Sequence, residues 1–99
     1  MVPLIAIVEL HIDVTKADDA KTAIREMLSE TRSFDGCERV DVLVDQDDPG
    51  HLRLYEVWET KEHNAAYSQW RRGPGRSTSL GPLLTTTPAS AKFAVDDSI

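Results

Sequence analysis

The spacing of apolar residues in this chain switches between the two-residue period of a strand and the longer period of a helix. Residues 4–14 alternate strictly and predict a first strand with one apolar side, made of Leu4, Ala6, Val8, Leu10, Ile12 and Val14. Between residues 18 and 33 the apolar positions lie three and four apart, which predicts an amphipathic helix. Asp35-Gly36 follows as a stop signal for that helix.

The strand-like alternation returns in residues 40–45 and 52–58, on either side of a Gln-Asp-Asp-Pro-Gly turn, and predicts a hairpin. Thr60 then suits the start of a second helix, which Gly73-Pro74-Gly75 would end. The predicted inner side of this helix carries Ala66, Tyr67 and Trp70. After a loop, residues 89–95 alternate again and predict a last strand.

The resulting order of elements is the ferredoxin-like split βαβ pattern, an α+β fold whose antiparallel sheet carries both helices on one face. A chain of 99 residues, 40% of them hydrophobic, can bury one core, so we expect a single domain over residues 1–99. The other face of the sheet would also be apolar, with Ile5, Ile7, Leu43, Tyr55 and Val57. Because such a face needs cover, we expect a homodimer that packs sheet against sheet.

The charge and the cysteine content exclude several classes of protein. Seventeen acidic and eleven basic residues give a net charge of −6, which repels the phosphates of nucleic acid. No apolar run approaches the about 20 residues that span a bilayer and no signal segment is recognised, so we expect a cytoplasmic protein without a membrane partner. The single cysteine, Cys37, excludes an internal disulfide and a thiolate metal cage, and is predicted to be a small packing residue.

The segment Tyr55-Glu56-Val57-Trp58-Glu59-Thr60-Lys61-Glu62 resembles the signature of the antibiotic biosynthesis monooxygenase (ABM) domain family, within the dimeric α+β barrel superfamily. A helix that ends in Thr31-Arg32 before Asp35-Gly36-Cys37 agrees with the family in order and spacing, as does the acidic turn of the hairpin. The resemblance covers residues 4–95. It implies a dimeric barrel with a cavity between the sheet and the helices of each subunit.

Many members of this family resemble oxygenases that act on quinols or aromatic polyketides with dioxygen and without flavin or metal. An electron-rich phenolate can pass an electron to dioxygen itself when the site deprotonates it, orients it and excludes water. The first hypothesis is therefore a cofactor-independent monooxygenase for a quinol-like or polycyclic phenolic substrate. The second is a non-catalytic dimeric barrel that binds a small hydrophobic ligand. Haem degradation fits less well, because residues 77–80 lack the histidine and the first strand lacks the asparagine of that branch.

Alternation places Leu54, Glu56 and Trp58 on one face of the third strand. Trp58 matches the family's signature tryptophan, and its indole would line the cavity and donate a hydrogen bond to substrate; the alternative is a core residue bonded to a backbone carbonyl. Glu56 would face an apolar cavity with a raised pKa and act as the base that removes a phenolic proton. Its alternative is a structural acid paired with an arginine or with helix backbone.

Tyr67 and Arg72 stand where many relatives have histidines on the second helix. Tyr67 would orient a substrate oxygen, and Arg72, or its neighbour Arg71, would stabilise an anionic oxygen. The alternative assigns Tyr67 to packing and the arginines to solvent. Substrate binding is assigned to Leu54, His63 and Trp70, with an exposed position as the alternative for His63.

Glu9, His11 and Asp13 share one face of the first strand and in principle offer metal ligands. Carboxylate and imidazole groups at this spacing are common on a solvated strand end, so no metal is expected here. His51 is predicted to be exposed in the turn of the hairpin. The chain has no Gly-x-Gly-x-x-Gly, phosphate-binding loop or Gly-x-Ser-x-Gly motif, so no nucleotide cofactor is expected either.

Overall fold

The computed structural model describes residues 3–99, so the first two residues of the expected 1–99 domain lie outside it. Its helices and strands are β1 (Leu4–His11), α1 (Ala17–Ser33), β2 (Cys37–Asp45), β3 (Asp48–Trp58), α2 (Lys61–Arg72) and β4 (Ala89–Ala94). Short 3₁₀ turns at Val14–Lys16 and Gly81–Leu83 precede α1 and β4. The predicted order of strands and helices is confirmed.

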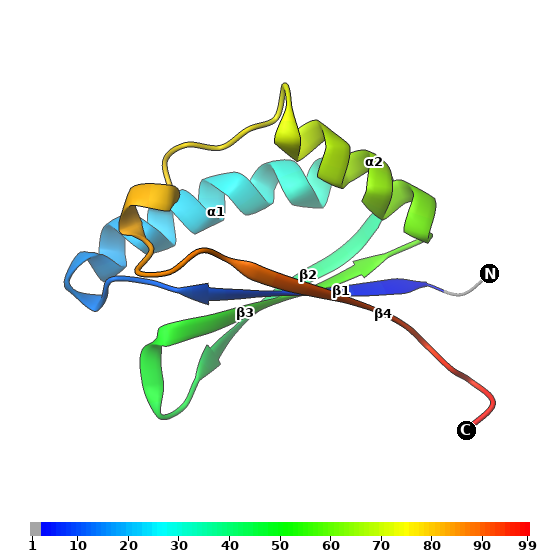
Figure 1. The fold of residues 1–99 in the computed structure, drawn as a ribbon, viewed down its shortest axis with the longest axis horizontal. Coiled ribbons are helices and arrows are strands. Elements are labelled where there is room, and N and C mark those ends of the chain that lie inside the picture. The colour runs from blue at the N-terminus through cyan, green and yellow to red at the C-terminus, as the bar shows by residue number, and fades with distance from the viewer. Residues whose placement is uncertain (1–2) are drawn as a thin grey trace.

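The four strands form one antiparallel sheet in the order β2-β3-β1-β4, and α1 and α2 both cover the same face of it (Figure 1). This arrangement confirms the α+β ferredoxin-like fold. The core lies between the sheet and α1, where Leu10, Leu28 and Leu54 are almost fully buried. No helix among the described residues is long and apolar enough to cross a membrane.

The ends of the helices follow local signals in the sequence. The Thr60 hydroxyl accepts a hydrogen bond from the backbone N–H of His63 at 3.1 Å, which confirms the predicted cap of α2. Gly73 follows the last residue of α2, as predicted. After α1, Gly36 has a φ of +86°, a conformation that glycine adopts without strain, and this turn leads the chain into β2.

The predicted first strand is too long. It ends at His11, because the carboxylate of Asp13 accepts hydrogen bonds from the backbone and hydroxyl of Thr15 and starts a 3₁₀ turn. Val14 therefore leaves the apolar face and is 54% exposed. Asp13 is committed to this turn and does not join Glu9 and His11 as the sequence pattern suggested.

Two further predictions about side-chain placement are wrong. The β2–β3 turn is shorter than expected, since β3 already begins at Asp48, so His51 lies within β3 and its side chain is only 17% exposed. On α2, Ala66 faces solvent, and Asn64 is the residue buried against the sheet. Asn64 and Tyr67 lie three residues apart and therefore share a helix face, whereas Ala66 is turned away from it.

The outer face of the sheet carries the apolar residues that the alternation predicted. Ile5 lies between Val57 on β3 and Phe93 on β4, and Ile7 is the partner of Tyr55. Phe93 remains 52% exposed, because neither helix covers this side. The apolar face is present as expected, and the homodimer that would cover it stays a prediction.

Candidate functional site

A cavity of about 150 Å³ lies between the helix-facing side of the sheet and the two helices. β1, β3, β4, α1 and α2 all contribute to its walls. Its apolar lining residues are Ala6, Val8, Met27 and Leu54. Its polar lining residues are Glu56, Asn64, Tyr67, Ser68, Ser90 and Lys92. Apolar atoms nevertheless form most of the lining surface, and a mainly apolar space with a few converging polar groups is the usual form of a small-molecule site.

Glu56 is the acid of this cavity and is only 4% exposed. Loss of hydration raises the pKa of its carboxyl group, while the Trp58 hydrogen bond and the charges of Arg71 and Lys92 lower it by less. The group therefore binds its proton more tightly than an exposed glutamate does. Such a carboxyl group is suited to exchange a proton with a weakly acidic hydroxyl.

Trp58 is completely buried and holds Glu56 in place. Its indole N–H donates a hydrogen bond to Oε1 of Glu56 at 3.0 Å, since the two side chains project from the same face of β3. The indole therefore meets a carboxylate, neither the substrate nor the backbone carbonyl that the sequence alternatives offered. Trp58 stands behind Glu56 and Tyr67, and the cavity lining does not include it.

Asn64 is a polar residue of the cavity that the sequence reasoning missed. Its side chain is 3% exposed, and its Oδ1 atom has no hydrogen-bond partner among residues 3–99. A buried acceptor without a partner is costly, by about 1–3 kcal/mol. A ligand that carries a hydrogen-bond donor would remove this cost. The signal available in the sequence was the three-residue spacing from Tyr67 on the same helix face.

Tyr67 presents its ring to the cavity while its hydroxyl is bonded to the protein. Nε of Arg71 donates to this hydroxyl at 2.8 Å, and the hydroxyl lies 2.7 Å from Oγ1 of Thr31. The Thr31 hydroxyl is also placed to donate to the carbonyl of Met27, so Tyr67 donates to Thr31. Both hydrogen-bonding capacities of the Tyr67 hydroxyl are used, which leaves its aromatic face for a ligand.

The arginine that matters structurally is Arg71. Besides Tyr67 it donates to the Met27 carbonyl at 2.8 Å, to Thr31 Oγ1 at 3.1 Å, to the Gly75 carbonyl at 3.0 Å and to Glu30 at 3.2 Å. These bonds join α2 to α1 and to the loop after α2. Arg72 is exposed and has no side-chain hydrogen bond or ion pair in the described part of the chain, so the structure does not place it at the cavity.

Comparison with known proteins identifies the family. The family model for antibiotic biosynthesis monooxygenases matches residues 3–76, about three quarters of the chain. This chain belongs to the antibiotic biosynthesis monooxygenase family. A search of curated proteins finds no match. The resemblance predicted from the Tyr-Glu-x-Trp segment is confirmed.

Several solved structures share the fold of this chain. A Mycobacterium tuberculosis protein is 23% identical, with a TM-score of 0.76, and 96% of each chain is covered. A Nitrosomonas europaea protein that carries the family's name is 22% identical with a TM-score of 0.76, and the match covers 94% of this chain and 89% of the other. A Caulobacter crescentus relative reaches a TM-score of 0.80 at 11% identity, covering 97% and 92%. At these identities the likeness shows the fold alone.

The other two residues assigned to substrate binding from the sequence, Trp70 and His63, lie outside the cavity. Trp70 packs its ring against Gly75 and lies 4.8 Å from the guanidinium carbon of Arg71, where it covers the end of α2. Nδ1 of His63 lies 2.7 Å from the Thr60 hydroxyl, at the start of the same helix. Of the expected substrate-binding residues, Leu54 alone lines the cavity among the described residues.

Proposed function

We propose that this ABM-family protein oxidises a small quinol-like phenol with dioxygen in the cavity between the sheet and the helices, without a cofactor. The proposal depends on two groups that line the same cavity. One is the buried carboxyl group of Glu56, whose pKa is raised, and the other is Oδ1 of Asn64, which has no hydrogen-bond partner among the described residues. A quinol has two hydroxyl donors and a flat apolar ring, which are the features these groups and the surrounding walls accept.

In the proposed reaction, Glu56 takes the proton of one hydroxyl of the substrate. The resulting phenolate gives an electron to dioxygen, and a carbon–oxygen bond then forms at the ring as a peroxide. Loss of water leaves a hydroxyquinone, so one oxygen atom enters the product and the other leaves as water. The quinol supplies the remaining electrons and both hydrogens of that water, so no further reductant is needed.

Other residues of the cavity hold the substrate for this step. Oδ1 of Asn64 accepts a hydrogen bond from the second hydroxyl, and the ring of Tyr67 forms an aromatic wall. Lys92 lines the same cavity and favours the charged phenolate, the role that the sequence reasoning gave to Arg72. Trp58 orients Glu56 through its indole N–H.

The size of the cavity narrows the substrate class. A closed apolar cavity of about 150 Å³ accommodates a molecule the size of benzene. The cavity of this chain has about the same volume, 150 Å³, which favours a single-ring quinol over the polycyclic phenols that the family resemblance also allowed. A fused-ring substrate would have to displace α2 or extend out of the cavity into solvent.

The proposal includes a homodimer in the cytoplasm as the working form. Support for the dimer comes from the uncovered outer face of the sheet, where Ile5, Ile7, Tyr55 and Phe93 lie together on β1, β3 and β4. Two such faces packed together would remove these side chains from water. The cavity lies on the opposite face and would stay separate from this contact.

A specific observation favours a second candidate function, a non-catalytic barrel that binds a small hydrophobic ligand. Trp58 N–H and the Tyr67 hydroxyl, two groups expected to act on the substrate, are both bonded within the protein. A cavity in which these two groups are not free to bind a substrate can hold a hydrophobic ligand without catalysing a reaction. Turnover separates the two functions.

The test measures dioxygen consumption with single-ring quinols and naphthoquinols, together with ligand binding by calorimetry. Glu56→Gln keeps an acceptor for the Trp58 N–H but removes the base, so turnover is expected to fall about 100-fold or more while binding is retained. Glu59→Gln, at an exposed glutamate, is the matched control and leaves turnover unchanged. Binding of the panel without turnover by the unaltered protein would favour the second candidate, and equal turnover by Glu56→Gln would remove Glu56 as the base.

A further inference from the structure

Glu9, His11 and His51 come together on the outer face of the sheet, on the side opposite the cavity. Glu9 and His11 are two residues apart on β1, and His51 on β3 is the direct cross-strand partner of His11. Nε2 of His51 lies 2.8 Å and Nε2 of His11 lies 3.4 Å from the same atom, Oε1 of Glu9. One ligand atom from each residue thus lies within 4.8 Å of the others.

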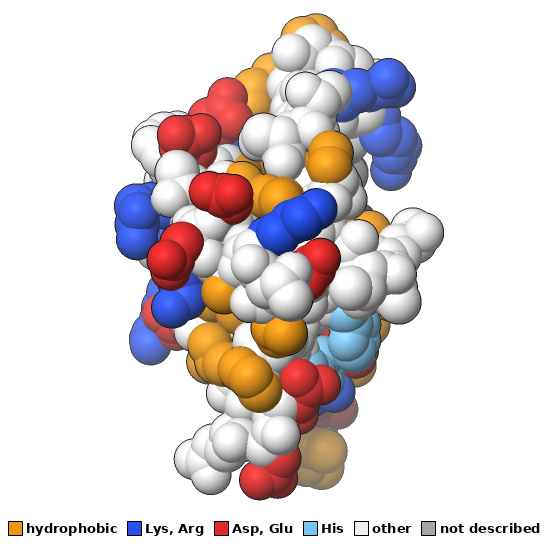
Figure 2. All heavy atoms as spheres, turned by 90° about the vertical axis from the view of Figure 1, so that its left-hand side faces the viewer, with side chains coloured by type: hydrophobic (Ala, Val, Ile, Leu, Met, Phe, Trp, Pro, Cys, Tyr) orange, Lys and Arg blue, Asp and Glu red, His pale blue; other side chains and the backbone are white. Residues whose placement is uncertain are grey.

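Asp45 at the end of β2 holds the other side of His51. Its Oδ2 lies 2.9 Å from Nδ1 of His51, so this imidazole stands between two carboxylates. Nδ1–H donates to Asp45, and Nε2 then needs either a second proton or a bound cation opposite Glu9. A carboxylate on the far nitrogen is the usual way in which proteins orient a histidine that binds a metal. Figure 2, which views the molecule from the end with the β2–β3 turn, shows histidine beside acidic side chains.

We propose that Glu9, His11 and His51 form a binding site for a divalent transition metal of the Zn²⁺ type. Zinc bound at about 2.0–2.1 Å from nitrogen and oxygen ligands in a tetrahedron separates those ligands by about 3.3 Å. The two distances to Oε1 of Glu9, 2.8 and 3.4 Å, lie close to that separation. Three protein ligands leave a fourth position open to water or to a donor atom of another molecule.

The side chains have room for the adjustment that binding requires. The rings of His11 and His51 are stacked at 4.7 Å and nearly parallel, so their lone pairs must tilt toward a shared point. The side chains of Glu9 and His11 are 37% and 39% exposed, and both can rotate. The other charges near the cluster are Asp45 on β2 and Arg53, which lies opposite Glu9 on β3. The two carboxylates and the cation of Arg53 leave a net negative environment.

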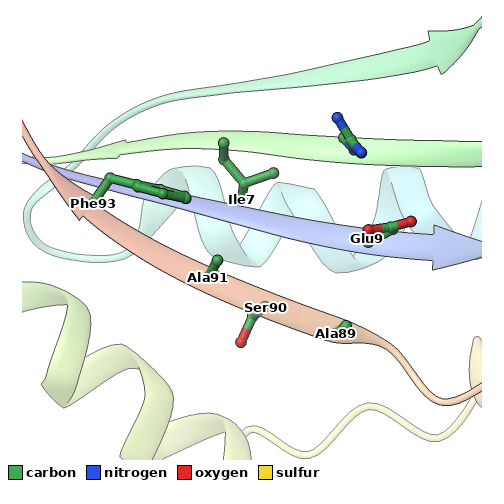
Figure 3. Close-up of a pocket in the computed structure, with 7 residues that line it drawn as sticks. Ile7, Glu9, Ala89, Ser90, Ala91 and Phe93 are labelled. Carbon is green, nitrogen blue, oxygen red and sulfur yellow. The ribbon is translucent and has the colours of Figure 1, made fainter.

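The open position borders a hollow of about 290 Å³ on the same face. Glu9 lines this hollow together with Ile7, Ala91 and Phe93, and Figure 3 shows their side chains along one face of β1 and β4. A metal held by Glu9 would therefore stand at the end of an apolar surface. In the proposed homodimer a second copy covers this apolar surface, so the fourth ligand is a water molecule or a donor atom of that copy.

The experiment titrates the tag-free protein with Zn²⁺ by calorimetry and with Co²⁺ by visible absorption. We expect binding of one ion for each chain and an intense Co²⁺ spectrum of the tetrahedral type. His51→Asn is expected to lower the affinity by more than the about 10- to 100-fold typical of losing a residue that only orients a ligand, and Asp45→Asn by an amount within that range. His63→Asn, which removes a histidine outside the cluster, is the control and leaves the affinity unchanged.

Binding that is unaffected by both His51→Asn and Glu9→Gln overturns the proposal, as does a loss of binding in His63→Asn. Circular dichroism checks that each variant is folded, and Glu9→Gln serves if His51→Asn does not fold.

Discussion

Replacing Asn64 by leucine tests whether the cavity holds an acceptor that awaits a ligand. In the free protein, Oδ1 of Asn64 is buried without a partner, which costs about 1–3 kcal/mol. Leucine has no polar atom and is a better helix former than asparagine. The two side chains have the same branched shape, and the adjoining cavity of about 150 Å³ gives room for the larger methyl groups of leucine. We therefore expect the free energy of unfolding to rise by about 1–2 kcal/mol, against the usual direction of core substitutions.

The assay is urea and thermal unfolding of the free protein. A gain of 1 kcal/mol corresponds to a rise of about 4–8 °C in Tm for a domain of this size. Gln69→Leu, on the exposed side of the same helix, is the control and is expected to change stability by less than about 0.5 kcal/mol. The same Asn64→Leu protein should bind single-ring quinols about tenfold or more weakly, through loss of one hydrogen bond.

Destabilisation by Asn64→Leu would refute the reasoning about the unpaired acceptor. Unchanged quinol affinity in a stabilised variant would refute the assignment of Oδ1 to the ligand, while the stability argument would stand. A variant that gains stability and loses binding is the outcome that the structure supports.

Three further substitutions test other parts of the structure. For Glu56→Gln, stability relative to the unaltered protein should increase as pH rises above 4.5, the ordinary pKa of a glutamate, because burial raises the pKa of Glu56 in the folded protein and its ionisation then costs stability. A difference in urea unfolding that does not change with pH would contradict the raised pKa. Gly36→Ala should lower the free energy of unfolding by about 2 kcal/mol or more, because φ is positive there and the added carbon would clash with the His63 ring. Gly81→Ala, with open space around it, is the control and should be neutral or stabilising in the same assay. For Arg71→Lys, loss of the guanidinium hydrogen bonds should destabilise the protein by about 2–3 kcal/mol by chemical unfolding, and an equal effect of Arg72→Lys would refute the assignment.

The fold was readable from the sequence because each element has its own period and its own stop signal. The caps at Thr60 and Gly73 are local, and they ended α2 where the sequence predicts. The first strand ran too far in the prediction, since Val14 continues the alternation although the Asp13 side chain has already turned the chain. The alternation of apolar and polar residues does not show where the backbone turns. A single side-chain hydrogen bond can therefore end a strand while the alternation continues in the sequence.

The site was less readable, because its chemistry depends on which polar atoms pair with one another. Glu56 and Leu54 were placed correctly at the cavity by strand alternation. Arg71 and Arg72 are neighbours and point to different sides of α2. The few apolar residues of α2 do not specify which of the two sides faces the rest of the protein. The only sequence signal for Asn64 is its three-residue spacing from Tyr67. An asparagine on a short polar helix is usually exposed, and only the tertiary structure shows that its acceptor is unpaired.

The burial of Trp58 also gives the protein an optical reporter. The chain has two tryptophans, one completely buried beside Glu56 and the other, Trp70, partly exposed at the end of α2. With phenylalanine at position 70, all indole emission would come from Trp58, whose ring lies 4.8 Å from the Tyr67 ring that lines the cavity. A ring that fills the cavity changes the polarity and the quenching around this indole, so occupancy becomes visible as intrinsic fluorescence without any label.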